Sequence, residues 1–341
     1  MPEAPGRGAG WRPWRVAWQD ALYGAGGFYR SAEGPAGHFG TSATMPAGVR
    51  EVFAGAVLRL AAEQGCTTVV DVGAGRGELL AALDRARSTR LELLGVDVVP
   101  RPAGLPEAVG WLESPGGADL PSGLTGLAEA LVLANEWLDV VPLDVLEVDR
   151  RGVPRVVEVD RSGRERLGPA ADEEQLGWCR GWWPIEGSPA GTRAEVGLTR
   201  DAAWAGLVAR VESGVCVAVD YGHRRSQRPP AGSLAAHRAG RLVPVQPDGS
   251  CDLTADVALD SLDGARAGAT LRTQREALSE LGVAATRPAA QTGDPATYLA
   301  ALQHAGAAAE LLDPGGLGGF GWLQRRVVIG QPEPAPARVG R

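Results

Sequence analysis

Apolar residues recur along the chain in two spacings, which predict strands and helices in alternation. Short apolar or β-branched runs of the buried-strand type occupy Thr68–Val72, Leu91–Val98, Ala108–Leu112, part of Leu127–Leu138 and Val215–Asp220. Apolar residues at helical spacing occur between Pro46 and Glu63, and again at Leu79, Leu80 and Leu83. This alternation is typical of a parallel, doubly wound α/β sheet with helices on both faces.

The alternation is interrupted twice, which predicts insertions into the sheet. Residues 144–200 hold two strand-like runs around Arg-Gly, which predict a hairpin, and then a polar, Trp-rich stretch. Residues 222–260 have the Gly, Pro and Arg content of a lid or a long loop. We expect a partly flexible segment over 1–45, one domain over 46–330 with these insertions, and a disordered tail over 331–341.

Weaker patterns complete the second half of this domain. Trp204, Leu207, Val208 and Val211 predict a helix that Gly214 can cap. The segments TLRTQREALSELG and QHAGAAAELL are helix-like, and Gly321–Ile329 predicts a last strand. The residues up to about Gly40 are rich in Gly, Trp and Arg and show little periodicity.

Charge and cysteine usage argue against several classes of protein. The net charge of −7 and the pI near 5.3 disfavour binding to nucleic acid or to an anionic membrane. The four cysteines form no C-x-x-C pair, so we predict neither a metal site nor disulfides. No apolar stretch has membrane-spanning length, and the first residues have no signal-peptide core. We expect a cytoplasmic protein without membrane contacts, and the sequence leaves a homo-oligomer open.

The glycine motif GAGRG at Gly73–Gly77 is the first candidate binding site. With 48 glycines in 341 residues, about one such match is expected by chance. The copy GRGAG at Gly6–Gly10 has no strand before it and prolines on both sides. GAGRG instead follows the apolar run that ends at Val72 and precedes a helix. A strand, a glycine turn and a helix N-terminus together predict a corner that binds an anion or a nucleotide.

The spacing of the motif favours one nucleotide over another. A dinucleotide fingerprint would need a third glycine where this chain has Glu78. The stretch DVGAGRG resembles motif I of Rossmann-like S-adenosylmethionine (SAM) methyltransferases. Asp97 closes the next strand and can accept hydrogen bonds from ribose hydroxyls of either SAM or NAD. The predicted SAM-binding residues are Asp71, Gly73, Ala74, Gly75, Gly77, Asp97, Glu113 and Asn135.

Several segments in order resemble one family, the MidA-like SAM-dependent methyltransferases. They include GGFYRSAEGPAGHFGTSATMP, VVDVGAGRGELL, LVLANEWLDVVPLDVLEV, RAEVGLT, VAVDYGH, GSLAAHR and CDLTADV, and the resemblance extends from Gly26 to Ile329. The most specific element is ANEWLDVVP. The family includes the mitochondrial arginine methyltransferase that assists assembly of respiratory complex I. The resemblance implies a class I methyltransferase fold, SAM as the donor, and a protein or peptide arginine as the acceptor.

Two positions depart from the family pattern and keep other functions open. Asp256 stands where the family often has histidine, and His237 stands where it often has tyrosine. If either side chain contacts the substrate, the acceptor differs from that of the relatives. A SAM-binding assembly or chaperone-like protein without turnover is one alternative. An NAD(P)-dependent oxidoreductase is another, which Glu78 disfavours.

Polar residues at the predicted strand ends supply the candidate catalytic groups, Glu136, Asp139, Glu195 and His223. Asn135, Glu136 and Asp139 follow the fourth strand, at the rim where open α/β sheets bind ligands. The Asn/Asp-Pro-Pro-aromatic signature of amide and exocyclic-amine methyltransferases is missing here. A carboxylate suits a guanidinium acceptor, so Glu136 is the first choice and Glu195 the second. The alternatives are that Glu136 binds the SAM amino group or a loop N–H, and that Glu195 is structural.

Histidines and tryptophans give further candidates with two interpretations each. His223 ends the fifth strand and is either a proton acceptor near neutral pH or an exposed loop residue. His38 lies in a segment that could fold over the cofactor. Trp178, Trp182 and Trp183 form either an aromatic wall for a cation or the packing of the insertion onto the core.

Overall fold

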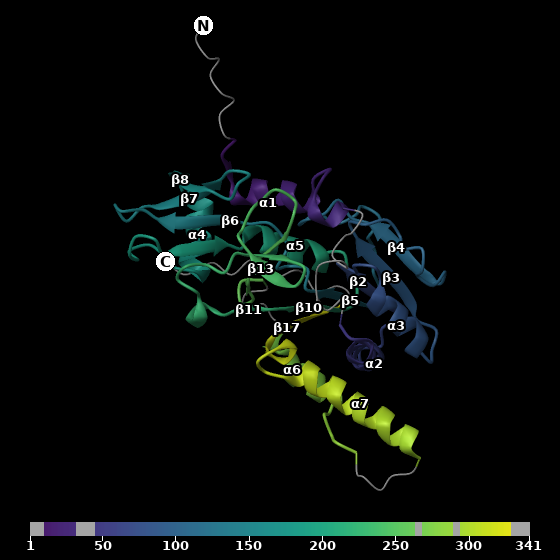
Figure 1. Ribbon diagram of the computed structural model, residues 1–341. Coiled ribbons are helices and arrows are strands. Elements are labelled where there is room, and N and C mark those ends of the chain that lie inside the picture. The colour runs from purple at the N-terminus through teal and green to yellow at the C-terminus, as the bar shows by residue number, and fades with distance from the viewer. Residues whose placement is uncertain (1–9, 32–44, 263–267, 289–293, 329–341) are drawn as a thin grey trace.

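A seven-stranded sheet forms the centre of the molecule (Figure 1). The computed structural model describes residues 10–31, 45–262, 268–288 and 294–328. The strand order is β16 (Ala269–Thr273), β17 (Gly321–Val327), β10 (Gly214–Asp220), β5 (Ala130–Asn135), β2 (Thr68–Val72), β3 (Glu92–Asp97) and β4 (Val109–Glu113). Strands β10, β5, β2, β3 and β4 are parallel, and β17 is antiparallel to both of its neighbours. The predicted α/β fold is confirmed.

Helices cover both faces of this sheet because its central strands are apolar on both sides. In β5, Leu131 and Leu133 belong to one core, and Val132 and Ala134 belong to the other. The first core is closed by four helices, α2 (Ala47–Glu63), α3 (Glu78–Ala86), α6 (Gln274–Glu280) and α7 (Pro295–Leu312). The second is closed by α5 (Leu198–Val208), whose Trp204 is fully buried. Continuous apolar strands are what a sheet covered on both faces requires.

A second sheet lies beside the first and contains the hairpin expected after residue 144. The hairpin consists of β6 (Asp144–Val148) and β7 (Pro154–Val159), which are antiparallel. The sheet is completed by β1 (Arg12–Pro13), β8 (Glu165–Ala170) and β9 (Arg193–Val196), and α4 (Glu173–Trp182) follows β8. The helix α1 (Trp14–Tyr23) packs against β6 and β7 at this end of the molecule (Figure 1).

Residues 222–260 form short strands rather than one long loop. β12 (Ala235–Arg238) pairs with β13 (Arg241–Val243) and β14 (Asp252–Thr254), both antiparallel. β11 (Gly222–His223) pairs with β15 (Val257–Ala258) in parallel, and the short helix η4 (Arg225–Gln227) follows β11. This arrangement brings β14 back against the carboxyl ends of β5 and β10, since Ala255 N donates to the Asp139 carbonyl over 3.1 Å.

Two local expectations are wrong, and one helix was not predicted. Helix α5 ends before Ala209, and Gly214 instead begins β10, where a Cβ atom would lie 2.0 Å from the Ala130 carbonyl oxygen. The segment TLRTQREALSELG is partly strand, because β16 ends at Thr273, whose side chain caps α6. The N-terminal part contains α1, which buries Trp14 and Trp18, and the short helix η1 (Phe28–Arg30).

Other expectations concern absences or residues that the structure leaves undescribed. In the described ranges, no helix has the length and apolar character needed to cross a bilayer. Those same ranges contain no group of three or more His, Cys, Asp or Glu residues that could hold a metal ion. His38, residues 6–9 of the first glycine motif and the tail over 331–341 lie outside the described residues.

Candidate cofactor and acceptor site

The turn between β2 and α3 has a backbone that only glycine adopts readily. Gly73, Gly75 and Gly77 have φ values of 76°, 60° and 75°. A Cβ atom on Gly77 would lie 2.6 Å from Leu105 Cδ1, so glycine also prevents a steric clash there. Gly77 directly precedes α3, whose first backbone N–H groups therefore begin at this turn. The turn presents backbone and a helix N-terminus to the edge of the sheet, as a nucleotide site requires.

Asp97 links the next strand to the glycine turn. Its Oδ2 accepts a hydrogen bond from Gly75 N over 2.8 Å, and its Oδ1 accepts one from Val99 N over 3.2 Å. Burial raises the pKa of Asp97 to about 6, and the backbone donors oppose this shift. Each carboxylate oxygen keeps a further lone pair. Asp97 can therefore accept hydrogen bonds from both ribose hydroxyls while it keeps its hydrogen bond to the glycine turn. Glu113 is paired with Asp97 in the β3–β4 register, and its side chain is exposed.

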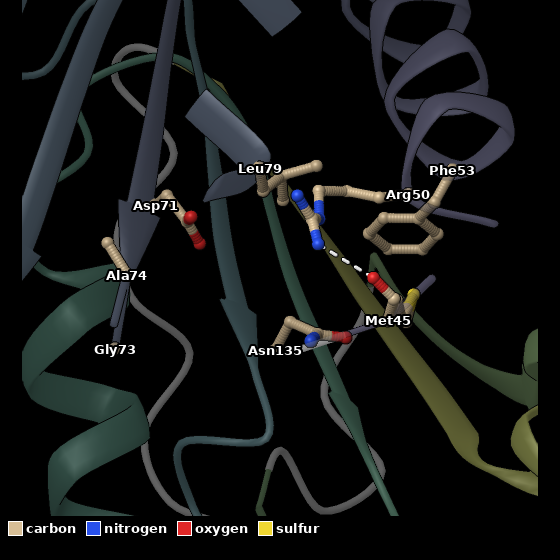
Figure 2. Close-up of a pocket in the computed structure, with 8 residues that line it drawn as sticks. All are labelled: Met45, Arg50, Phe53, Asp71, Gly73, Ala74, Leu79 and Asn135. Carbon is tan, nitrogen blue, oxygen red and sulfur yellow. Dashed lines mark hydrogen bonds between the residues drawn. The ribbon is translucent and has the colours of Figure 1, made fainter. Parts of the chain in front are cut away.

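A pocket opens beside the turn and brings four of the predicted SAM-binding residues together (Figure 2). It is lined by Met45, Arg50, Phe53, Asp71, Gly73, Ala74, Leu79 and Asn135. Asp71 is 4% exposed, and burial raises its pKa to about 8. These residues fit SAM, because an acidic side chain, an amide and the glycine backbone meet in one pocket.

Arg50 is a charged pocket residue that the sequence analysis did not identify. One of its nitrogens, Nη2, donates to the Met45 carbonyl over 2.7 Å, as Figure 2 shows. Its Nε atom is buried and has no hydrogen-bond partner within the described residues. The signal in the sequence was an arginine near the start of α2, next to Glu51 and among small and apolar residues. Its guanidinium suits the carboxylate end of an amino-acid-like ligand.

The tip of β5 carries Glu136 in an unusual backbone conformation. Glu136 has a φ of 48°, in the left-handed region that non-glycine residues rarely adopt. Its N–H donates to the Val219 carbonyl of β10 over 2.8 Å, which fixes the residue at the strand end. Such conformations cost on the order of 1–3 kcal/mol and persist where the surroundings impose them, often at functional sites.

Asp220, at the end of β10, holds the loop that follows Glu136. Its Oδ2 accepts hydrogen bonds from Leu138 N over 3.0 Å and from Asp139 N over 3.3 Å. Burial raises the pKa of Asp220 well above its ordinary value, and the nearby Asp139 and Glu136 raise it further. Asp220 therefore positions the predicted catalytic loop.

Asp139 is buried behind this loop, near the cationic side chain of Arg200. Its Oδ2 accepts a hydrogen bond from the Tyr221 hydroxyl. The Arg200 guanidinium, in a side chain 1% exposed, donates to the Asp139, Val141, Ala255 and Asp256 carbonyls over 2.6 to 3.1 Å. Burial raises the pKa of Asp139, while Tyr221 and Arg200 lower it. Arg200 thus ties the loop after β5 to the segment after β14.

Glu195 and His223 do not line the pocket beside the glycine turn, and both are held by contacts with the insertions. Glu195 is 2% exposed and accepts hydrogen bonds from Ser233 N, Ser233 Oγ and Leu234 N over 2.6, 2.6 and 2.7 Å. These contacts support its structural interpretation. His223 Nδ1 lies 2.6 Å from Arg228 Nη1, and burial and this arginine lower its pKa to about 4. Such surroundings suit neither a base at neutral pH nor an exposed loop histidine.

The three tryptophans of the insertion pack rather than line the site. Trp178 donates from Nε1 to Asp201 over 2.7 Å, and Trp183 meets the His223 ring edge-on with ring centroids 4.8 Å apart. Trp178 and Trp183 belong to one apolar cluster, and Trp182 packs against it. The packing interpretation therefore agrees with the structure.

Two tyrosines and an aspartate near the cleft were not identified from the sequence. Tyr29 donates from its hydroxyl to Asp252 Oδ1 over 2.8 Å, and Tyr23 donates to the Val140 carbonyl over 3.2 Å. Tyr29 belongs to the segment that begins GGFYR, and Asp252 belongs to CDLTADV, whereas Tyr23 precedes the region of resemblance. The segments of Tyr29 and Asp252 carry family resemblance and no other signal. That resemblance was the one available signal for their place in the site.

The sheet order, the glycine turn and the acidic strand ends define a Rossmann-like SAM methyltransferase fold. Residues 52–276 match the model of a family described as "Putative S-adenosyl-L-methionine-dependent methyltransferase". The chain belongs to this family, whose methyl donor is SAM.

Two solved structures have the same fold. One is a COG1565 superfamily member from Burkholderia thailandensis, solved bound to S-adenosylhomocysteine. It is 24% identical with a TM-score of 0.71, and the match covers 96% of this chain and 91% of that one. A native structure of a COG1565 superfamily protein from the same organism is 23% identical with a TM-score of 0.71, covering 93% and 87%. Comparison with curated proteins gave no match.

Proposed function

We propose that this protein transfers a methyl group from SAM to an arginine guanidinium of a protein or peptide, as a MidA-like methyltransferase in the cytoplasm. One observation carries the proposal. Four carboxylates, Glu136, Asp139, Asp220 and Asp252, gather where β5, β10 and β14 meet. The Arg200 guanidinium lowers the pKa of Asp139 and of Asp220. A group of four carboxylates, of which the three aspartates are buried, favours a cationic ligand.

The shape of a guanidinium supports arginine as the acceptor at these carboxylates. A guanidinium is planar, stays charged and presents N–H donors in a fork that matches carboxylates. An amide acceptor would need donors as well as acceptors, and ANEWLDVVP lacks the Pro-Pro turn of amide methyltransferases. The four cysteines are free and buried, which agrees with a reducing compartment.

Each part of the site has a separate task in this reaction. SAM, when bound, supplies an electrophilic methyl group. The glycine turn and Asp97 orient the ribose, and Glu136 holds the guanidinium so that one nitrogen lone pair lines up for in-line attack. Methyl transfer adds a second positive charge to the guanidinium and releases S-adenosylhomocysteine, and Glu136 stabilises that charge until the attacked nitrogen loses a proton to solvent. Asp220 and Arg200 keep the Glu136 loop in place.

Methyl labelling followed by peptide sequencing tests the proposal. The purified protein and SAM are added to protein extracts, and peptides that gain about 14 Da per methyl group are sequenced by mass spectrometry. The variant Gly75→Val, which we expect not to bind SAM, gives the background. Methylated arginine supports the proposal. Methyl transfer to another residue type, or SAM binding with no transfer to any protein, contradicts it, and the second result favours the assembly-factor alternative.

A further inference from the structure

Two tyrosines at the cleft share one arrangement, in which a partly exposed phenol donates its proton to a buried aspartate. Tyr29 donates to Asp252 Oδ1 over 2.8 Å, and Tyr221 donates to Asp139 Oδ2. Both aspartates are 3% exposed, whereas both tyrosines keep part of their surface open to solvent. The tyrosines come from distant parts of the chain, η1 and the end of β10, so no local pattern imposes this likeness.

Strand β14 places the two pairs side by side. Asp252 and Thr254 are two residues apart in this strand, so their side chains point to the same face, about 7 Å apart. Asp252 contacts Tyr29, and the Thr254 side chain lies against the Tyr221 hydroxyl. Ala255 N donates to the Asp139 carbonyl over 3.1 Å, which attaches this end of β14 to the loop after Glu136. Both phenols therefore lie on one face, next to the predicted catalytic loop.

The direction of the hydrogen bonds decides what these phenols can bind. A tyrosine hydroxyl has one proton, and in both pairs that proton is directed to a carboxylate. The oxygen is left with lone pairs and acts only as an acceptor. Asp139 Oδ1 is also buried with no hydrogen-bond partner among the residues described. A surface of acceptors backed by carboxylates matches a cation that carries several N–H donors and no acceptor.

We propose that the Tyr29–Asp252 and Tyr221–Asp139 pairs form the binding site for the cationic group of the acceptor, through their two phenol oxygens. The inference rests on the proposed arginine acceptor and adds how that acceptor is selected. A guanidinium can donate to both oxygens at once. The neutral ureido group of citrulline has the same shape but carries a carbonyl oxygen, which would face acceptors only and lose its own hydrogen bond.

Binding measurements test this inference without turnover. The protein is saturated with S-adenosylhomocysteine and titrated in a calorimeter with Nα-acetyl-arginine methylamide and with its citrulline analogue. We expect the arginine probe to bind at least about ten-fold more tightly than the citrulline probe, since removing a hydrogen bond that involves a charged group weakens binding by about this factor. Tyr29→Phe and Tyr221→Phe should each weaken the arginine probe by about ten-fold or more. Affinity for S-adenosylhomocysteine should stay within about two-fold, which also shows that each variant is folded.

The matched control is Tyr298→Phe, because Tyr298 is a partly exposed tyrosine on α7. Figure 1 shows α7 well apart from β13, which belongs to the same small sheet as β14. Tyr298→Phe should leave both probes unaffected. Equal affinity for the two probes, no binding of the arginine probe, or unchanged affinity in both phenylalanine variants overturns the inference. A parallel loss of S-adenosylhomocysteine affinity also overturns it, because the phenols would then bind the cofactor. If both phenylalanine variants still methylate arginine, this inference is refuted and the proposed function is not. If the arginine probe binds through the two tyrosines but no methyl group is transferred, the proposed function is refuted and this inference is not.

Discussion

Replacing Asp97 by asparagine tests the cofactor site through a change of charge at nearly constant shape. Both carboxylate oxygens already accept backbone hydrogen bonds, from Gly75 N and Val99 N. An asparagine must turn its NH₂ group toward one of these N–H groups, so two donors would face each other. The variant also loses the charge that strengthens hydrogen bonds from the ribose hydroxyls. Hydrogen bonds to a charged group contribute about 1.5–3 kcal/mol, which corresponds to roughly 10- to 150-fold in affinity.

Calorimetric titration with SAM at pH 7.5 measures this loss. The control is Asp84→Asn, because Asp84 forms a local ion pair with Arg87 on α3 and should not affect SAM. The wild-type protein should also bind SAM more weakly at low pH. The pKa of Asp97 is raised to about 6, so the acceptor charge is present above this pH and lost below it. The titration of Asp97 alone should lower the affinity about four-fold between pH 7.5 and 5.5, and the variant should lack this contribution. Unchanged affinity in a folded Asp97→Asn protein refutes the role given to Asp97.

Three further predictions address the frame around the site. Arg200→Met removes the hydrogen-bond donors of four carbonyls. It should lower the free energy of unfolding, measured in urea, by about 3–5 kcal/mol, and a decrease under about 1 kcal/mol contradicts the account. Gly75→Val should abolish SAM binding in a dialysis assay because Gly75 has a φ of 60°, whereas Gly10→Val, with nothing within 4 Å of its Cβ, should not affect it. Burial raises the pKa of Asp71 to about 8, and a cationic ligand lowers it, so SAM binding at pH 7.5 should release a fraction of a proton. Binding enthalpies in buffers of different ionisation enthalpy report this release, and proton uptake would contradict it.

The sheet could be predicted because its signal is local in sequence. Thr68–Val72 is a short β-branched run in which only Asp71 is charged, it lies next to the glycine turn, and β2 has these same bounds. Helix α1 was missed although Trp14, Ala17, Trp18 and Ala21 repeat at helical spacing. This spacing was not recognised among the surrounding Gly, Pro and Arg residues. Its stability comes from packing against the second sheet rather than from a strong local preference.

The cofactor corner and the acceptor side of the site differ in how far the sequence could predict them. Asp71, Gly73 and Ala74 come from one strand and its turn, so their meeting in one pocket follows from chain order. The contact between Tyr29 and Asp252 joins residues 223 positions apart. Periodicity carries no information on such a pair. Glu195 shows the converse case, since hydrogen bonds from Ser233 and Leu234 of the second insertion support its structural alternative.

The rate of methyl transfer by Glu136→Gln tests the central claim most directly. The matched control is Glu129→Gln, because Glu129 has the same φ of 48° and immediately precedes the opposite end of β5. Single-turnover transfer to the arginine substrate should fall about 100-fold or more in Glu136→Gln, the scale of losing one electrostatic catalytic group. The SAM affinity of Glu136→Gln should change by less than about two-fold. The transfer rate and the SAM affinity of Glu129→Gln should also change by less than about two-fold. An unchanged transfer rate, or a collapse of SAM binding with the rate per bound SAM preserved, would contradict the assignment of Glu136 to the acceptor.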